Sequence, residues 1–405
     1  MNHRITVLFA SAAALTMAAG TAFAQAPAAP APAPAPAAAA APAPPAPPSL
    51  QPSMTAPLAT NGSPASFDLG PLGNKVYITG VLSGLAYTQS NHISGDQSSQ
   101  ADLSNAQIMI NKVDGVFQYY VQAGLYSLPA LGTGYAKATA ITPATYDYVP
   151  MAFVKIAPNA AFSIELGKLP TVIGSEYTFT FQNSNIERGL LWGQEPAISR
   201  GIQANYTTGP WAFALSVNDG LYSNRYTTVS GSATWTIDPT DTLIFAASGN
   251  TEKSKVSTFV TPQAQNDQQI YNLIYTHTHG PWSFTPYFQY TSVPSLPGLG
   301  GSSSTYGGAL LATYTFDAKG PASGWSLPMR VEYTSSTGSQ NLLFFGAGSN
   351  AWSITATPTF TYKVWFIRGE ASYTSVGSGA PGSMFGTSGT AKDQFRGLIE
   401  TGVLF

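Results

Sequence analysis

The chain has 405 residues, a formal net charge of −2 and no cysteine, and only 9% of its residues are charged. Soluble domains carry about 25% charged residues, so this composition argues against an ordinary soluble fold. The near-neutral charge argues against a nucleic-acid partner, which would require a basic face, and the lack of cysteine excludes a disulfide scaffold. A secreted β-protein and a transmembrane β-barrel remain.

Residues 1–24 have the pattern of a secretory signal peptide. Met1–Arg4 is a short basic start, an apolar run extends to about Gly20, and Ala22-Phe23-Ala24 precedes Gln25 in the A-x-A form of a cleavage site. The apolar run is shorter than the roughly 20 residues that a membrane-spanning helix needs. We therefore predict that the chain is exported and that residues 1–24 take no part in the fold.

Residues 25–66 are dominated by alanine and proline, followed by a stretch containing serine, threonine and asparagine. Proline removes backbone donors and favours extended polyproline geometry, so such a segment cannot build a core. We predict a disordered periplasmic linker here and a single β-barrel domain over residues 67–405.

Alternating segments of about ten residues recur through residues 67–405, as lipid-spanning strands require. Five of them place apolar residues at every second position: 117–125, 211–217, 229–237, 327–333 and 365–373. The fold class predicted is therefore all-β, a transmembrane antiparallel barrel of about 16 strands, with 14 to 18 allowed. It would begin near residues 75–89 and end at Phe405.

The connections alternate between tight turns and long polar stretches. The turn signals are Asp114-Gly115, Pro158-Asn159, Gly209-Pro210, Asp238–Asp241, Gly280-Pro281 and Tyr362-Lys363. The long stretches lie at about 90–100, 129–144, 170–199, 251–267, 292–304, 336–350 and 375–393. Short periplasmic turns opposite long external loops are typical of outer-membrane barrels, so the sequence predicts the outer membrane of a Gram-negative cell.

A short motif occurs twice at the predicted turns, as Gly209-Pro210-Trp211-Ala212-Phe213 and as Gly280-Pro281-Trp282-Ser283-Phe284. A tryptophan beside a turn would place its apolar body in lipid and its N–H in the hydrated layer. We therefore predict that Trp211 and Trp282 belong to an aromatic girdle at the membrane surface.

Charges within the predicted strands should point into the barrel, because an arginine or lysine facing lipid at mid-bilayer costs about 2–4 kcal/mol. The predicted pore-lining residues are Glu165, Arg330, Glu332, Arg368, Glu370, Arg396 and Glu400. Arg330 with Glu332, and Arg368 with Glu370, share a face and would form a ladder of alternating charge across neighbouring strands. Such a ladder both neutralises the wall and sets the field that a solute meets.

The longest connection, residues 170–199, follows the fifth predicted strand and is rich in charges and aromatic rings. Its charged residues are Glu176, Glu187, Arg188, Glu195 and, at its far end, Arg200. A loop of this length and composition predicts a functional element. In a ring of about sixteen strands the fifth and thirteenth lie opposite each other, so Arg330 and Glu332 would face this loop.

The end of the fifth predicted strand and the start of the loop after it resemble a known outer-membrane family. Glu165-Leu166-Gly167-Lys168-Leu169-Pro170-Thr171, continuing to Gly174-Ser175-Glu176, resembles the OmpL-like β-barrel porins, and the likeness covers most of residues 66–405. The resemblance to porins implies a diffusion channel, a third loop folded inward as a constriction, and a homotrimer. An external lid or adhesive loop is the alternative for residues 170–199.

The last eleven residues resemble the closing strand of outer-membrane barrels. Phe405, Val403, Thr401 and Ile399 share one face, and Glu400 and Arg396 lie on the other. The resemblance implies that the terminal phenylalanine is part of a signal for the barrel-assembly machinery. Outer-membrane lipid and lipopolysaccharide are then the surrounding partners.

Signals for an enzyme are weak. The chain has four histidines, and none has an evident serine or acid partner for hydrolysis. His277 and His279 share a strand face but lack a local third ligand, so an interfacial position is favoured over a metal site. We predict no catalytic residues, no metal and no cofactor.

The sequence therefore predicts an outer-membrane porin for passive diffusion of small hydrophilic solutes, with weak ion selectivity. One alternative is a solute-specific channel for sugars or small organic acids, in which Tyr120, Tyr126 and Tyr287 would stack on the solute. Another is a non-conducting adhesin or structural barrel whose lumen is plugged.

Overall fold

The computed structural model describes Leu50, Leu58 and residues 64–69, 75–258, 260, 262–317, 319 and 321–405. The predicted signal peptide and most of the predicted linker lie outside these residues. Within the described part of the chain, no helix has the length and apolarity needed to cross a membrane.

One antiparallel sheet forms almost the whole fold, and apart from β15 and β16 each strand pairs with the next in the chain. Its strands are β2 (Lys75–Gln89), β3 (Ser99–Lys112), β4 (Phe117–Tyr126), β5 (Met151–Ile156), β6 (Phe162–Pro170), β7 (Ile198–Thr208), β8 (Trp211–Asn218), β9 (Thr228–Thr236), β10 (Asp241–Asn250), β11 (Gln269–His279), β12 (Trp282–Val293), β13 (Ser303–Thr315), β14 (Trp325–Thr337), β15 (Asn350–Ala356), β16 (Thr359–Tyr362), β17 (Trp365–Ser378) and β18 (Asp393–Leu404).

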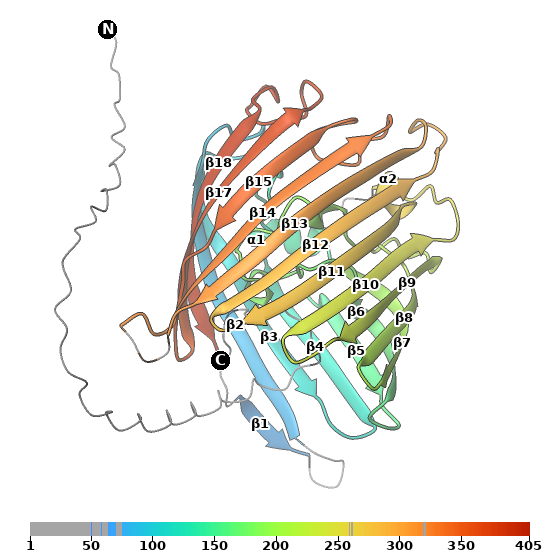
Figure 1. Cartoon of the computed structure of the whole chain (residues 1–405), viewed down its shortest axis with the longest axis vertical. Helices are drawn as coiled ribbons and strands as arrows, with labels where there is room; N and C mark the ends of the chain where they lie inside the picture. The colour runs from blue at the N-terminus through green and yellow to red at the C-terminus, as the bar shows by residue number, and fades with distance from the viewer. Residues whose placement is uncertain are drawn as a thin grey trace, which may run out of the picture. The chain divides into compact units, whose positions relative to one another are not determined.

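The sheet closes on itself because β18 pairs with β2, with Leu404 opposite Val81 and Arg396 opposite Gln89 (Figure 1). β15 and β16 both pair with β14 and β17, so they are the two halves of one wall strand interrupted at Thr357 and Pro358. The wall is thus a closed antiparallel barrel of 16 strands, as the sequence predicted.

A short additional strand, β1 (Ala65–Asp68), pairs with the start of β2 below the ring, with Ala65 opposite Ile78. It begins two residues before the predicted start of the barrel domain at residue 67. The alanine- and proline-rich composition that suggested a linker ends before this point, and the alternation of Ala65-Ser66-Phe67-Asp68 allows a strand. The boundary predicted at residue 67 falls within this strand.

The connections follow the predicted asymmetry. Gly209 and Gly280 each have a positive φ, near +53° and +56°, in tight turns that favour glycine at the first central residue.

Two connections were not recognised in the sequence, the loop 219–227 and the turn 316–324. The longer loops carry helix α1 (Ala138–Ala144), helix α2 (Gln263–Asn266) and two 3₁₀ turns, Thr180–Gln182 and Trp192–Gln194.

The outer surface of the barrel is apolar and edged with aromatic rings. Leu215, Val331 and Ile354 are exposed on it between the two ends. At the short-turn end Trp211 stacks on Trp235, with ring centroids 5.5 Å apart, and Trp282 contacts Tyr314. Toward the long-loop end lie the pairs Tyr271–Tyr290, Tyr306–Tyr333 and Trp352–Tyr373. Such aromatic belts mark the two surfaces of a membrane.

The seam between the first and last wall strands depends on a glycine. Gly80 and Phe405 exchange backbone hydrogen bonds of 2.7 and 3.0 Å. A Cβ at Gly80 would lie 2.3 Å from Cζ of the Phe405 ring. The terminal ring therefore packs flat against a site that only glycine leaves open.

We expect Gly80→Ala to displace the Phe405 ring and to lower the free energy of unfolding by roughly 1–3 kcal/mol, the usual cost of overpacking. Gly84→Ala is the matched control on the same face of β2, because a Cβ there meets nothing closer than 3.5 Å. Urea unfolding in detergent micelles, followed by tryptophan fluorescence, measures both variants. Equal stability of the two would contradict the packing argument.

Candidate functional site: the loop inside the barrel

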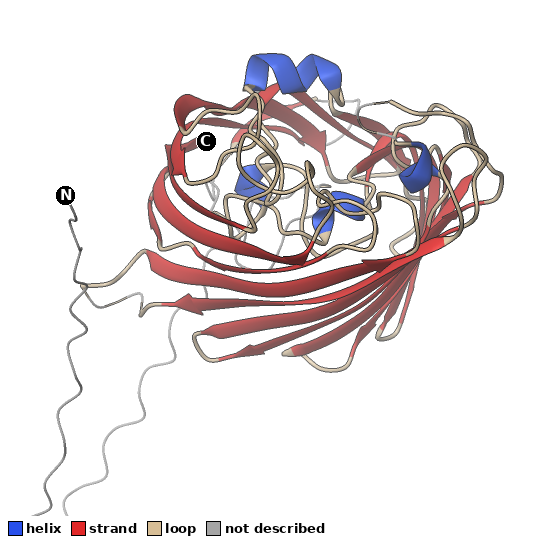
Figure 2. Cartoon of the chain, turned by 90° about the horizontal axis from the view of Figure 1, so that it is seen from above, coloured by secondary structure: helices blue, strands red, loops and turns tan. Residues whose placement is uncertain are grey.

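The loop 171–197 connects β6 to β7 and lies against the inner wall rather than outside the barrel. Seen from above, loops and short helical turns occupy the space within the ring of strands (Figure 2). Most side chains of this loop are buried. Among the described residues, its hydrogen bonds to the wall reach β3, β11, β12, β13, β14, β17 and β18. The loop is thus attached along an arc of the inner wall that runs from β11 through β18 to β3.

The first anchor is on β14. Arg330 Nη1 donates to Glu176 Oε1 at 2.6 Å and to the backbone carbonyl of Glu187 at 2.7 Å. Glu332 Oε1 accepts from the backbone N–H of Leu190 at 2.7 Å. β14 is the thirteenth wall strand, so the prediction that its charges face this loop agrees with the contacts observed.

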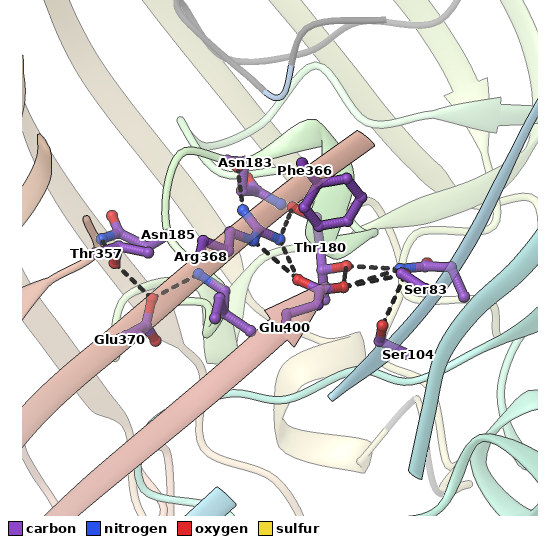
Figure 3. Close-up of polar contacts among 12 residues, drawn as sticks. Ser83, Ser104, Thr180, Asn183, Asn185, Thr357, Phe366, Arg368, Glu370 and Glu400 are labelled. Carbon is purple, nitrogen blue, oxygen red and sulfur yellow. Dashed lines mark hydrogen bonds and ion pairs between the residues drawn. The ribbon is translucent and has the colours of Figure 1, made fainter. Parts of the chain in front are cut away.

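The second anchor joins β17 and β18 (Figure 3). Arg368 and Glu400 are directly opposite in the sheet, and Arg368 donates to Glu400 Oε2 through Nε at 2.9 Å and Nη2 at 2.6 Å. The same guanidinium donates to the carbonyls of Asn183 and Thr180 at 3.0 and 2.9 Å. Glu370 accepts from the backbone N–H of Ile186 at 2.6 Å. The planar guanidinium of Arg368 thus binds the wall carboxylate of Glu400 and the loop backbone at the same time.

The third anchor is Arg396 on β18. It forms an ion pair with Glu187 of the loop and donates to Gln89 on β2 at 2.9 Å and to the carbonyl of Thr133 at 2.9 Å. Ser372 donates to the other oxygen of Glu187 at 2.9 Å. This arginine therefore joins the wall, the inner loop and the loop that follows β4.

Six of the seven predicted pore-lining residues are brought together by these anchors: Arg330, Glu332, Arg368, Glu370, Arg396 and Glu400. Glu165 lies apart and pairs with Lys155 on β5 at 3.2 Å. The expected ladder between neighbouring strands is present only at Arg368–Glu400, because the loop inserts its own acids and carbonyls between the other charges. Whether these residues line the water path stays a prediction.

The predicted loop residues divide into two groups. Glu176, Glu187, Arg188 and Glu195 are at most 4% exposed and lie in the anchored loop. Arg200 lies in β7 and is not part of this cluster. Its Nε pairs with Asp219 at 2.7 Å and its guanidinium lies 4.0 Å from the centre of the Tyr222 ring.

The cluster holds more acids than bases. Six carboxyl groups and four guanidinium groups are each at most 4% exposed; they belong to Glu176, Glu187, Glu195, Glu332, Glu370, Glu400, Arg188, Arg330, Arg368 and Arg396. Two negative charges would remain unpaired in a buried site if every group were ionised. Because unpaired buried charge is costly, some of these carboxyls should hold protons.

Glu195 is the clearest case. Burial raises its pKa to about 8; the hydrogen bond from Tyr287 opposes this shift, and the neighbouring Glu176 and Glu332 carboxylates reinforce it. Tyr287 donates to Glu195 Oε1 at 2.6 Å. Burial also raises the pKa of Glu176 and lowers that of Arg188 to about 10. Protonated Glu195 relieves part of the excess negative charge.

The sequence did not identify several loop contacts. The carbonyls of Thr180 and Asn183 bind Arg368, and backbone acceptors leave no residue-type signal.

Within the described residues, no group of three or more His, Asp or Glu side chains has the arrangement of a metal site. His277 contacts Asp241 at 2.9 Å, and its ring stacks along His279 on the same face of β11, the face that carries the exposed Tyr271 and Leu273.

Comparison with known proteins agrees with this architecture. Residues 75–405 match the family described as "Putative beta-barrel porin-2, OmpL-like". The chain belongs to this family. It is accordingly an OmpL-like β-barrel porin of the Gram-negative outer membrane. No curated protein matches the sequence.

Several solved porin structures share the fold at low sequence identity. The outer-membrane channel DcaP of Acinetobacter baumannii has a TM-score of 0.56 and 10% identity, covering 84% of this chain and 100% of that one. An anion-selective porin from Comamonas acidovorans has a TM-score of 0.52 and 11% identity, covering 82% and 99%. OmpT of Vibrio cholerae, in a trimer form, has a TM-score of 0.54 and 10% identity, covering 82% and 99%.

Removing one anchoring cation should release the loop of this OmpL-like porin. Arg330→Met leaves Glu176 and Glu332 buried without their cation, a change that typically costs about 3–5 kcal/mol. We expect faster hydrogen–deuterium exchange in peptides from the loop 171–197. Arg225→Met is the matched control, because the Arg225–Glu252 pair is about half-exposed and such pairs contribute about 0–1 kcal/mol. Unchanged exchange in Arg330→Met would exclude this anchor.

Loop attachment should weaken as pH rises. Because the packed loop favours protonated Glu195, its contribution is complete below the ordinary pKa of 4.5 and is lost as pH rises toward about 8. We expect larger fluctuations of single-channel current at pH 8 than at pH 5. Glu195→Gln keeps an acceptor for Tyr287 without the charge and should flatten this dependence. An identical pH profile in the variant would refute the assignment.

Proposed function

We propose that the barrel is a passive diffusion channel for small hydrophilic solutes, narrowed by the loop 171–197. The observation that carries this proposal is the attachment of the loop to the inner wall through Arg330, Arg368 and Arg396. A barrel of 16 strands is too wide for wall side chains alone to fill. A loop attached along the wall from β11 through β18 to β3 reduces that width, and we propose that it leaves a passage along β6–β9.

The open passage runs along the inner face of β6–β9. Side chains there are small or uncharged and partly exposed, and include Asn205, Ala212, Ala214, Ser232 and Thr234. The outward neighbours Phe213 and Leu215 are 42% and 61% exposed, which supports an inward direction for Ala214. A wall of this kind offers water an unobstructed surface and binds no particular solute.

Ion selectivity should be weak. The four buried arginines lie beside the acids of the loop and wall, so they project little field into the passage. Near the passage Lys155 and Glu165 pair with each other at 3.2 Å, which leaves no net charge on that part of the wall. Selectivity in such pores follows the charges that line them.

The solute-specific alternative has less support. Tyr120, Tyr126 and Tyr287 point inward, but each is at most 4% exposed. Tyr120 stacks against Phe153, Tyr126 against Phe179, and Tyr287 donates to Glu195. Their rings therefore present little free surface on which a sugar or an aromatic acid would stack.

We also propose a homotrimer in lipid and lipopolysaccharide, inserted by the barrel-assembly machinery. Beyond the Phe405 ring at Gly80, the outer face of β2 carries Leu82, Gly84 and Ala86, without the aromatic pairs seen on β11–β17. Small residues allow close approach of a second copy at that face. The trimer form of the similar OmpT supports the same arrangement.

Planar-bilayer recording tests the channel directly, and single cysteines test its path because the chain has none of its own. We expect a charged methanethiosulfonate reagent to reduce the conductance of Ala214→Cys. Ser353→Cys, fully buried beside Glu332, and Leu215→Cys on the lipid face should not respond. A protein without conductance would support the plugged adhesin, and saturable block by one solute would support the specific channel.

A further inference from the structure

An apolar patch lies on the inner wall at the short-turn end of the barrel, the end that faces the periplasm in outer-membrane barrels. It consists of Val81 on β2, Met109 on β3, Tyr120 on β4, Phe366 on β17 and Leu404 on β18, all at most 5% exposed. Their sequence neighbours Leu82, Ile108, Trp365 and Phe405 are 39–52% exposed on the outer face, so the patch residues point inward.

The patch is continuous across five neighbouring wall strands. Leu404 is opposite Val81, and Phe366 is opposite Gly402, two residues from Leu404. Met109 lies opposite Thr79 on one side and Gln122 on the other, next to Tyr120 in its strand. The next inward positions, Ser83, Gln107 and Arg368, are polar or charged. An apolar patch at a pore mouth is costly to leave in water.

A residue that precedes β1 belongs to the hydrophobic cluster that contains this patch, together with Phe179 and Phe181 of the inner loop. Leu58 is 4% exposed and belongs to the same hydrophobic cluster as Val81, Met109, Phe366 and Leu404, and Leu50 packs against that cluster as well. Both leucines precede β1 in the chain. Leu58 and Leu50 therefore pack with residues of the inner wall and the inner loop, not with the lipid-facing surface.

Chain length permits this position. β1 holds Ala65 opposite Ile78, three residues before Val81. Seven residue steps separate Leu58 from Ala65 and span at most about 25 Å. Leu58 is therefore within reach of the periplasmic mouth.

We propose that the segment preceding β1 docks in the periplasmic mouth of the barrel, with Leu58 as its apolar anchor on the patch. A solute crossing the pore passes this segment. The inference concerns a surface of the barrel and does not depend on which solutes the channel conducts.

Cysteine cross-linking in the full-length protein tests the docking. We expect Leu58→Cys with Met109→Cys to form a disulfide or a short bis-maleimide link in high yield. Leu58→Cys with Ile108→Cys is the matched control, because Ile108 is adjacent in sequence but 44% exposed on the lipid face. Equal yields in the two pairs, or no link in either, would overturn the proposal.

Thiol accessibility gives a second, independent readout. In the full-length chain, Met109→Cys should react slowly with a water-soluble thiol reagent and several-fold faster when Leu58→Glu is added, because the charged side chain leaves the apolar patch. Ala214→Cys, remote from the patch, should react at one rate in both backgrounds. An unchanged rate at Met109→Cys in a folded barrel would contradict docking.

Discussion

Buried guanidinium groups hold the interior of this barrel in place. Arg330, Arg368 and Arg396 come from three wall strands, and each binds both the wall and the loop 171–197. A lipid-facing position would be costly for these cations, so the strand alternation that turns apolar residues outward also turns the arginines inward. There they require partners, and the acids and carbonyls of the loop supply them.

That requirement explains the asymmetry of the lumen. The wall arginines cluster on β14, β17 and β18, so the ionic anchors of the loop lie there, whereas the inner face of β6–β9 carries small or uncharged, partly exposed residues. The excess of carboxyl groups over guanidinium groups in the cluster makes the attachment depend on protons. We propose that the loop sets the width of the passage in this porin and contributes little net charge to it.

Much of the wall was predictable from the sequence because the bilayer imposes a strict pattern. Alternation at Trp211–Val217 and Leu327–Tyr333 identified the lipid face, and the charge rule placed Arg330 and Arg368 inside. The missed connections, 219–227 and 316–324, contain the dipeptides Asp219-Gly220 and Gly320-Pro321, which are turn signals of the kind that identified other connections, so the sequence could have located both. β1 was missed because four residues give too weak an alternation beside a proline-rich segment.

The interior was less predictable. The position of Arg330 opposite the loop followed from strand counting, but the binding of Arg368 to carbonyls of Thr180 and Asn183 did not, because backbone acceptors have no signature in sequence. Arg200 was grouped with the loop by proximity in the chain, yet it pairs with Asp219. Leu58, within a stretch predicted to be linker, gave no sign that it would contact the inner wall.

An electron cryo-microscopy map of the full-length protein in lipid nanodiscs would test the central claim most directly. The account predicts density for the loop 171–197 against β14, β17 and β18, with a continuous water-filled passage along β6–β9. A loop projecting outside the barrel, or a lumen filled from wall to wall, would contradict it.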